Sequence, residues 1–312
     1  MRSLSRRNFL AASAGVALFP RFAPAAETTE LFKILLAQWS HNKAFFGRTG
    51  VEKKDPLKFA EISAKDYGIT AVEYVNQFYK DKKKDEAYLK DLKKVADDNK
   101  VVSVLIMCDG EGNLGNPDAK GRTTAVENHK RWAEWAKFLG CTSIRVNAAS
   151  DWKLGFAETQ KLAADGLRKL SEFTDTLGLN TIVENHGGLS SHGEWLAGVM
   201  KLADHKRCGT LPDFGNFNIG KVAGVKETSY DRYKGVDELM PFAKGVSAKS
   251  HEFDEKGNEK RTDYRKMLDI VVKKHKYAGY IGIEFEGGGD EAAGIKATKK
   301  LLETVRAELA KG

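Results

Sequence analysis

The stretch that decides the fold reads Val101-Val102-Ser103-Val104-Leu105-Ile106-Met107, and a polar loop and a longer amphipathic stretch follow it. Such an unbroken run of β-branched and aliphatic residues is typical of a strand buried on both faces of a parallel sheet. Similar runs recur with starts 28 to 42 residues apart, the length of one strand–helix unit. The predicted strands are 32–37, 70–75, 101–107, 143–147, 180–184, 208–213, 245–250 and 280–285.

Amphipathic stretches between and after these runs predict helices, because apolar residues recur at a spacing of three to four. They cover 86–99, 125–139, 158–177, 263–276 and 292–309. Gly140, Gly178 and Gly279 follow helical stretches, where a left-handed residue commonly ends a helix. Eight such units predict an α/β chain folded as a single-domain (β/α)8 TIM barrel. An open doubly wound sheet is the alternative, but no G-x-G-x-x-G motif follows the first strand to support its dinucleotide-binding form.

The first 25 residues have the pattern of an export signal. They contain Arg6-Arg7, then a short apolar run, then Ala23-Pro24-Ala25. The paired arginines before Phe9-Leu10 resemble a twin-arginine signal. We therefore expect 1–25 to be a signal peptide cleaved after Ala25, 26–312 to be the barrel, and the mature protein to be periplasmic with no stable membrane insertion. An ordinary export signal with a chance arginine pair is the alternative.

The charge balance gives little support to a nucleic-acid partner. The chain carries 51 basic residues, but four of them lie in the first 25, which leaves 47 against 43 acidic residues. Such a small excess is not the basic footprint of a nucleic-acid-binding protein. The three cysteines show no C-x-x-C spacing, which excludes a zinc ribbon. Assembly into a homo-oligomer is compatible with these sequence features.

Polar side chains gather where the predicted strands end, and TIM-barrel active sites lie at that end of the barrel. Glu184, Asp213 and Glu284 each stand in or directly after an apolar run on strands five, six and eight. A carboxylate is costly to bury unless it is paired or binds a metal. With His251 after strand seven, these residues predict a site for one divalent ion, with Mn²⁺, Mg²⁺ or Co²⁺ favoured and Zn²⁺ as a further option. Helix capping or pairing with lysines is the structural alternative.

These motifs resemble the xylose isomerase-like TIM-barrel group of sugar isomerases and epimerases. The resemblance covers about residues 32 to 308 and is carried by four segments. In that family one metal is held by Glu, Asp, His and Glu from strands five to eight, which implies Glu184, Asp213 and Glu284 here. Many relatives have His-x-Lys on strand seven, where this chain reads Ser247-Ala248-Lys249. The segments are Ile182-Val183-Glu184-Asn185-His186, Leu211-Pro212-Asp213-Phe214-Gly215-Asn216, Ala248-Lys249-Ser250-His251-Glu252-Phe253-Asp254 and Gly279-Tyr280-Ile281-Gly282-Ile283-Glu284.

The missing histidine leaves the last ligand open. His251 lies two residues beyond Lys249, so the same strand parity would point it at the barrel mouth. It is our expected fourth ligand, with a role in substrate binding as the alternative and Glu286 as a rival for the last position. Other polar or aromatic residues near the strand ends are expected to contact substrate: Trp39, His41, Glu73, Asn147, His186, Asn216, Lys249 and Glu286.

The resemblance implies proton transfer at a carbon next to a carbonyl, with a small carbohydrate as substrate. Glu184 and Glu284 are the expected catalytic groups, one removing the proton and the other returning it. The expected protein is thus a metal-dependent isomerase or epimerase of a free sugar or keto-sugar. A lyase or hydratase of oxidised (3-keto) sugars or glycosides would begin with the same proton removal. A multi-zinc endonuclease and a non-catalytic sugar-binding protein are the other classes, and neither explains the converging carboxylates as well.

Overall fold

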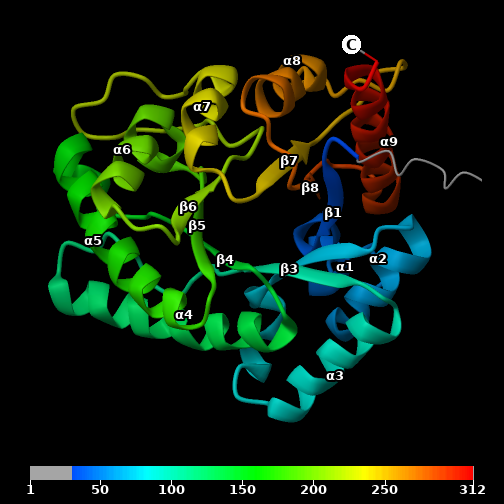
Figure 1. Cartoon of the computed structure of the whole chain (residues 1–312), viewed down its shortest axis with the longest axis horizontal. Helices are drawn as coiled ribbons and strands as arrows, with labels where there is room; N and C mark the ends of the chain where they lie inside the picture. Colours follow the sequence, from blue (N-terminus) through cyan, green and yellow to red (C-terminus); the bar gives the residue numbers. More distant parts are fainter. Residues whose placement is uncertain (1–29, 312) are drawn as a thin grey trace, which may run out of the picture. The chain divides into compact units, whose positions relative to one another are not determined.

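Strands and helices alternate along the chain in the computed structural model, which describes residues 30–311 (Figure 1). The strands pair in parallel in the order β6-β5-β4-β3-β2-β1-β8-β7, which confirms the predicted (β/α)8 barrel and excludes the open doubly wound sheet. The signal peptide expected over 1–25 lies outside the described residues. The strands are β1 Lys33–Ala37, β2 Ala71–Val75, β3 Val102–Met107, β4 Ser143–Val146, β5 Asn180–Glu184, β6 Cys208–Leu211, β7 Val246–Ser250 and β8 Tyr280–Phe285.

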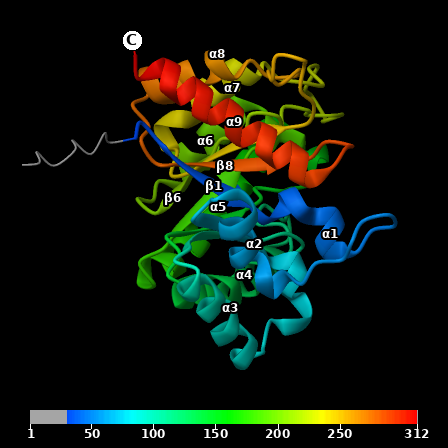
Figure 2. The ribbon, with the colours of Figure 1, turned by 90° about the vertical axis from the view of Figure 1, so that its right-hand side faces the viewer.

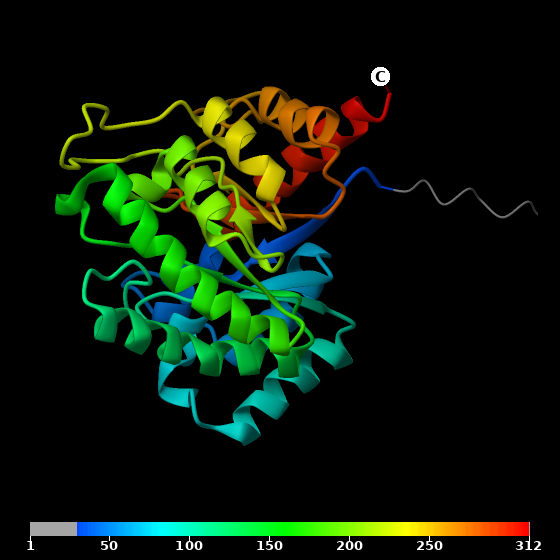
Figure 3. The same ribbon diagram turned by 60° about the vertical axis from the view of Figure 1, so that its left-hand side comes forward.

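Helices cover the outside of the barrel. Helices α4 and α5 contact each other along the outer surface (Figure 3), and α9 packs against β8 (Figure 2). None of the helices within residues 30–311 is long and apolar enough to cross a membrane. The helices are α1 Asn42–Phe46, α2 Phe59–Tyr67, α3 Glu86–Asp98, α4 Ala119–Leu139, α5 Gly155–Thr176, α6 Gly193–Ala203, α7 Arg232–Leu239, α8 Tyr264–Leu268 and α9 Glu291–Leu309, and a π-helical turn Asp269–Lys274 follows α8.

The barrel closes between β6 and β7 through a few backbone contacts. The N–H of Ser247 donates to the carbonyl of Pro212 over 2.9 Å, and the N–H of Phe214 donates to the carbonyl of Ser247 over 3.0 Å. Asp213 and Ser247 therefore stand opposite each other in a parallel bridge. The seam of the barrel thus lies at two of the strand ends that carry polar side chains.

Several predicted boundaries need correction. Strand β6 ends at Leu211 and not at 213, because the backbone N–H of Asp213 turns to the side chain of Asn185 at 2.7 Å. Helix α4 begins at Ala119, since Asp118 caps it by accepting from the N–H of Gly121. Gly140 and Gly178 do take positive φ angles.

Gly279, by contrast, does not take the left-handed conformation predicted for it. The residue with positive φ after the π-helical turn is Lys276, at 55°. Gly279 is needed for space: a Cβ there would lie 2.5 Å from the hydroxyl oxygen of Tyr277, well inside contact distance.

A register shift between β2 and β3 sets the position of one buried acid. Val72 pairs with Ser103, but Glu73 pairs with Leu105, so β3 carries one extra residue. Such bulges redirect side chains near active sites. Glu73 is buried in the barrel interior at 1% exposure.

Candidate metal centre and active site

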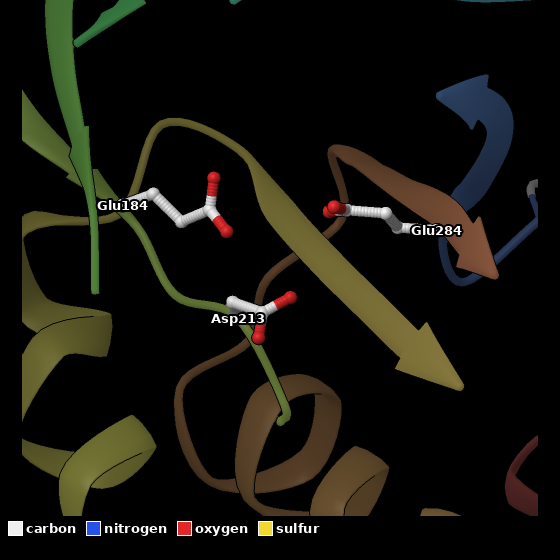
Figure 4. Close-up of side chains that lie close together, drawn as sticks. All are labelled: Glu184, Asp213 and Glu284. Atoms are coloured by element: carbon white, nitrogen blue, oxygen red, sulfur yellow. The ribbon is translucent and has the colours of Figure 1, made fainter. Parts of the chain in front are cut away.

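Three buried carboxylates converge inside the barrel. Glu184 ends β5, Asp213 follows β6 and Glu284 lies in β8, and all three are at most 2% exposed. One oxygen from each lies within 4.8 Å of the others. Figure 4 shows the three carboxyl groups pointing toward a common space, with Glu184 and Glu284 on opposite sides of it. The three side chains come from β5, the end of β6 and β8, which the closed barrel places around one interior space.

Arg145 balances part of this charge from β4. Its side chain is 1% exposed, and its Nε donates to Oε2 of Glu184 over 2.6 Å. The same guanidinium donates to Oδ1 of Asp109 over 2.7 Å. Burial on its own would raise the pKa of Asp109, but the Arg145 charge outweighs it and the pKa falls to about 2. Arg145 thus ties two anions together and orients Glu184.

Lys249 is the second buried cation, and it comes from β7. Its Nζ lies 3.0 Å from Oε1 of Glu284 and 3.0 Å from Oε2 of Glu286. The indole N–H of Trp39 donates to the other oxygen of Glu286. Despite its burial, the neighbouring carboxylates raise the pKa of Lys249 well above its usual value, so this amine is an ammonium ion.

Ser247 lies between two of the carboxylates. Its Oγ is 2.7 Å from Oδ2 of Asp213 and 2.8 Å from Oε2 of Glu284. The other Asp213 oxygen accepts the backbone N–H groups of Gly215 at 2.9 Å and Asn216 at 2.8 Å. These contacts hold the Asp213 carboxyl in one orientation.

Negative charge exceeds positive charge in this part of the barrel. Burial, together with repulsion from Glu184 and Glu284, raises the pKa of Asp213 to about 8, although Lys249 opposes the shift. Burial and the same neighbouring carboxylates raise the pKa of Glu73, and its Oε1 has no hydrogen-bond partner. Two cations therefore leave the buried acids only partly compensated, and an added positive charge would stabilise them.

A cavity of about 240 Å³ opens above this group of side chains. Trp39 and Met107 supply its apolar wall, while Asp109, Arg145, His186 and Glu284 supply polar groups. Burial and the Arg145 charge lower the pKa of His186 to about 4. His186 is therefore neutral at physiological pH and can both donate and accept a hydrogen bond.

The structure brings most of the predicted site residues to this part of the barrel. Asn216 donates to Oε1 of Glu184 over 2.8 Å, and Asn147 donates to Asp109 over 2.6 Å. The other residues gathered here are Trp39, Glu73, His186, Lys249 and Glu286.

Two predicted residues do not join this group. His251 follows the end of β7, where its backbone N–H donates to Glu259 over 3.1 Å and its ring Nδ1 lies 4.0 Å from the same carboxylate. It is not among the ligand atoms that converge with the three carboxylates. His41 is buried against the Tyr67 hydroxyl, 2.9 Å from its Nε2, and lines a different cavity. Strand parity, the basis for expecting His251 at the barrel mouth, does not extend past Ser250, where β7 ends.

Sequence reasoning missed Arg145, Ser247 and Asp109 as parts of the site. Arg145 had a usable signal, because a charged residue inside a short apolar strand must find a buried partner. The signal at Ser247 was its position, where many relatives have the histidine of His-x-Lys, but its two carboxylate partners are 34 and 37 residues away.

Comparison with known proteins places this barrel among related folds. Residues 63–306 match the family model described as xylose isomerase-like TIM barrel. No curated protein matches the chain in sequence.

Solved structures with the same fold include the apo form of 3-keto-D-glucoside 4-epimerase from E. coli, at 14% identity and TM-score 0.65, covering 88% of this chain and 99% of that one. A xylose isomerase-like TIM barrel protein from Mycobacterium smegmatis in complex with magnesium matches at 14% identity and TM-score 0.64, covering 88% and 97%. The probable 3-DHS dehydratase from Bacillus anthracis matches at 14% identity and TM-score 0.62, covering 87% and 99%. At these identities the similarity is evidence of a shared fold alone.

Proposed function

Because this chain belongs to the xylose isomerase-like TIM-barrel family, we propose that it is a divalent-metal-dependent isomerase or epimerase of a free sugar or keto-sugar. The observation that carries the proposal is the convergence of Glu184, Asp213 and Glu284 within 4.8 Å inside the barrel. The epimerases among the structural neighbours support the reaction class, and the magnesium complex supports the metal.

The residues present fit a divalent cation. Oxygen ligands with negative charge suit Mg²⁺ and Mn²⁺, and Glu184, Asp213 and Glu284 supply them. The unpartnered Oε1 of Glu73 and the raised pKa of Asp213 both indicate that the local positive charge is insufficient. When bound, the cation would supply Lewis-acid stabilisation of the oxygen charge that develops next to a carbonyl.

The two glutamates would move the proton. Glu184 and Glu284 reach the common space from opposite sides, so one can remove a proton from the α-carbon while the other returns one. Arg145 donates from its Nε to Oε2 of Glu184 over 2.6 Å, which orients the carboxyl group for this role. His186 faces the cavity as a neutral imidazole and is suited to hydrogen-bond a substrate hydroxyl, while Trp39 offers an aromatic wall for the sugar ring.

The second candidate is a lyase or hydratase of oxidised (3-keto) sugars or glycosides. It is favoured by the likeness to a dehydratase and by Lys249, a buried ammonium ion next to Glu284 whose charge would stabilise a departing oxygen anion. Both reactions begin with the same proton removal. Product analysis by NMR separates them, because only the second reaction loses or gains water.

Metal binding is expected to release protons. Near pH 7 the carboxyl of Asp213, whose pKa is about 8 without metal, carries a proton that a cation must displace. Calorimetric titration with Mg²⁺ or Mn²⁺ in two buffers of different ionisation enthalpy should show up to about one proton released per metal below pH 7, falling toward none as the pH rises past about 8. Binding of less than about half an equivalent would instead favour a non-catalytic sugar-binding protein.

Export remains part of the proposal. The Arg6-Arg7 pair, the apolar run and Ala23-Pro24-Ala25 support a twin-arginine-type signal and a periplasmic enzyme. N-terminal sequencing of the protein from the periplasmic fraction is expected to begin at Ala26. An intact Met1 in that fraction would contradict cleavage, and substitution of both arginines by lysine should keep the protein in the cytoplasm.

A further inference from the structure

The proposed metal centre has only oxygen donors among residues 30–311. The side chains that converge there are the carboxylates of Glu184, Asp213 and Glu284, and no histidine or cysteine joins them. His251 is turned toward Glu259. We infer that the hydroxyl of Ser247 completes an all-oxygen ligand set, which suits the site to hard cations such as Mg²⁺ and Mn²⁺ and removes the extra affinity that a nitrogen ligand would give Zn²⁺. This inference rests on the proposed function.

The position of Ser247 is fixed by the backbone and not by its own side chain. Its N–H and C=O both bond across the seam of the barrel, to Pro212 and Phe214. The residue is fully buried, so its Oγ has no access to bulk water. The backbone of Ser247 is therefore held at the seam, next to Asp213, and its hydroxyl points between the two carboxyl groups.

The Ser247 hydroxyl lies between two carboxyl groups and has a single proton of its own. A hydroxyl has one proton to donate and two lone pairs. Its oxygen nevertheless lies within hydrogen-bonding distance of two carboxylate oxygens, one from Asp213 and one from Glu284. One of the two contacts then needs either a second proton on a carboxyl oxygen or a cation held among the three oxygens. A cation held by both carboxylates would be near enough for the hydroxyl oxygen to bind it as well.

A second buried oxygen supports the same conclusion. Ser247 pairs in register with Gly282 of β8, and a Cβ on Gly282 would lie 3.4 Å from Oε2 of Glu73. The other oxygen of Glu73 is buried without a hydrogen-bond partner. The interior at the level of Ser247 therefore presents a further oxygen donor, the unpartnered carboxyl oxygen of Glu73.

The chemistry of the donors sets the expected preference. Imidazole and thiolate ligands favour Zn²⁺ and Co²⁺, whereas carboxylate, hydroxyl and water oxygens suit Mg²⁺, Ca²⁺ and Mn²⁺. Zn²⁺ binds most sites more tightly than Mn²⁺ does, so the quantity that reports the ligand set is the ratio of the two dissociation constants. For an all-oxygen site we expect a small ratio of the Mn²⁺ dissociation constant to the Zn²⁺ dissociation constant. A softer ligand at position 247 should increase this ratio.

The test begins with the full chain freed of metal by chelation. The protein is then dialysed against competing Mg²⁺, Mn²⁺ and Zn²⁺, and its metal content is measured. Ser247→Ala is expected to weaken Mn²⁺ binding by about tenfold, because one ligand is lost. Ser247→Cys, which is close in size, is expected to increase the affinity for Zn²⁺ relative to Mn²⁺ by about tenfold or more. Ser250→Ala is the matched control, since this buried serine of β7 contacts Thr298 and not the carboxylates. It should leave both constants unchanged.

The outcomes separate this inference from the proposed function. If the unaltered protein binds no metal, the proposed function is wrong. If it binds metal and Ser247→Ala binds Mn²⁺ equally well, the hydroxyl is not a ligand and this inference alone is overturned. Should Ser247→Ala fail to fold by circular dichroism, Ser247→Cys decides: an unchanged ratio of Zn²⁺ to Mn²⁺ affinity contradicts the inference.

Discussion

Glu184→Gln is expected to lower kcat by about 10²–10⁴-fold, the contribution typical of a positioned acid–base group. The amide is nearly the same shape as the carboxylate, so its oxygen can still accept from Arg145. Asn216 can present its own amide oxygen to the new NH₂ group, which preserves the local hydrogen bonds. Substrate binding should therefore survive while proton transfer is lost. The measurement is exchange of the α-proton in D₂O, followed by NMR over a panel of free ketoses and 3-keto sugars.

The control for this variant is a glutamate of the same kind outside the site. Glu172→Gln lies on α5 with 57% exposure and should keep full activity. Turnover by Glu184→Gln within about twofold of the unaltered enzyme would remove Glu184 from the proton-transfer role, since such a loss is far below the usual contribution. Metal content measured on the same samples separates loss of the base from loss of the ion.

Arg145→Met is expected to lower the free energy of unfolding by about 3–5 kcal/mol, because removing one partner of a buried ion pair leaves the other charge uncompensated. Arg145 is 1% exposed and contacts both Glu184 and Asp109, so two carboxylates lose their cation at once. Urea unfolding after chelation measures the effect. The loss should be smaller with saturating Mg²⁺, since a bound cation would offset part of the missing charge.

Two further variants test the cause of this destabilisation. Arg131→Met removes a surface arginine paired with Glu86 and Glu134, and exposed pairs contribute about 0–1 kcal/mol. Adding Glu184→Gln to Arg145→Met should recover part of the lost stability, because it removes one of the unpaired charges. If Arg145→Met were no more destabilising than Arg131→Met, the buried charge balance described here would be wrong.

The strands could be predicted from the sequence because burial of a strand imposes its pattern on neighbouring residues. A strand buried on both faces favours apolar residues, and most of the eight runs are rich in them within their own residues. The carboxylates were readable for a related reason: Glu184, Asp213 and Glu284 interrupt or end such runs, where a charge has no purpose in packing. The barrel then brings strand ends together by its geometry, so their convergence could be predicted without knowing any contact.

The contacts between side chains depended on tertiary structure. Arg145 finds its partners 36 and 39 residues away, and Ser247 stands between two acids only because β6 and β7 meet at the seam. The position of Glu73 depends on an extra residue in a neighbouring strand, which no pattern within β2 reveals. His251 was expected at the metal because alternation was extended beyond the end of β7, whereas the chain there has already left the sheet.

The barrel and the three acids were predictable from sequence patterns, because burial and alternation act within a few residues of each position, and the family was inferred from the resemblance of four segments. The folded chain was needed to show that Arg145 and Lys249 balance those acids and that a serine hydroxyl, not a histidine ring, lies among them. The cause is separation along the chain. Charge compensation and ligand geometry depend on contacts between strands, and a pattern within one strand does not reveal the register and barrel closure that create those contacts.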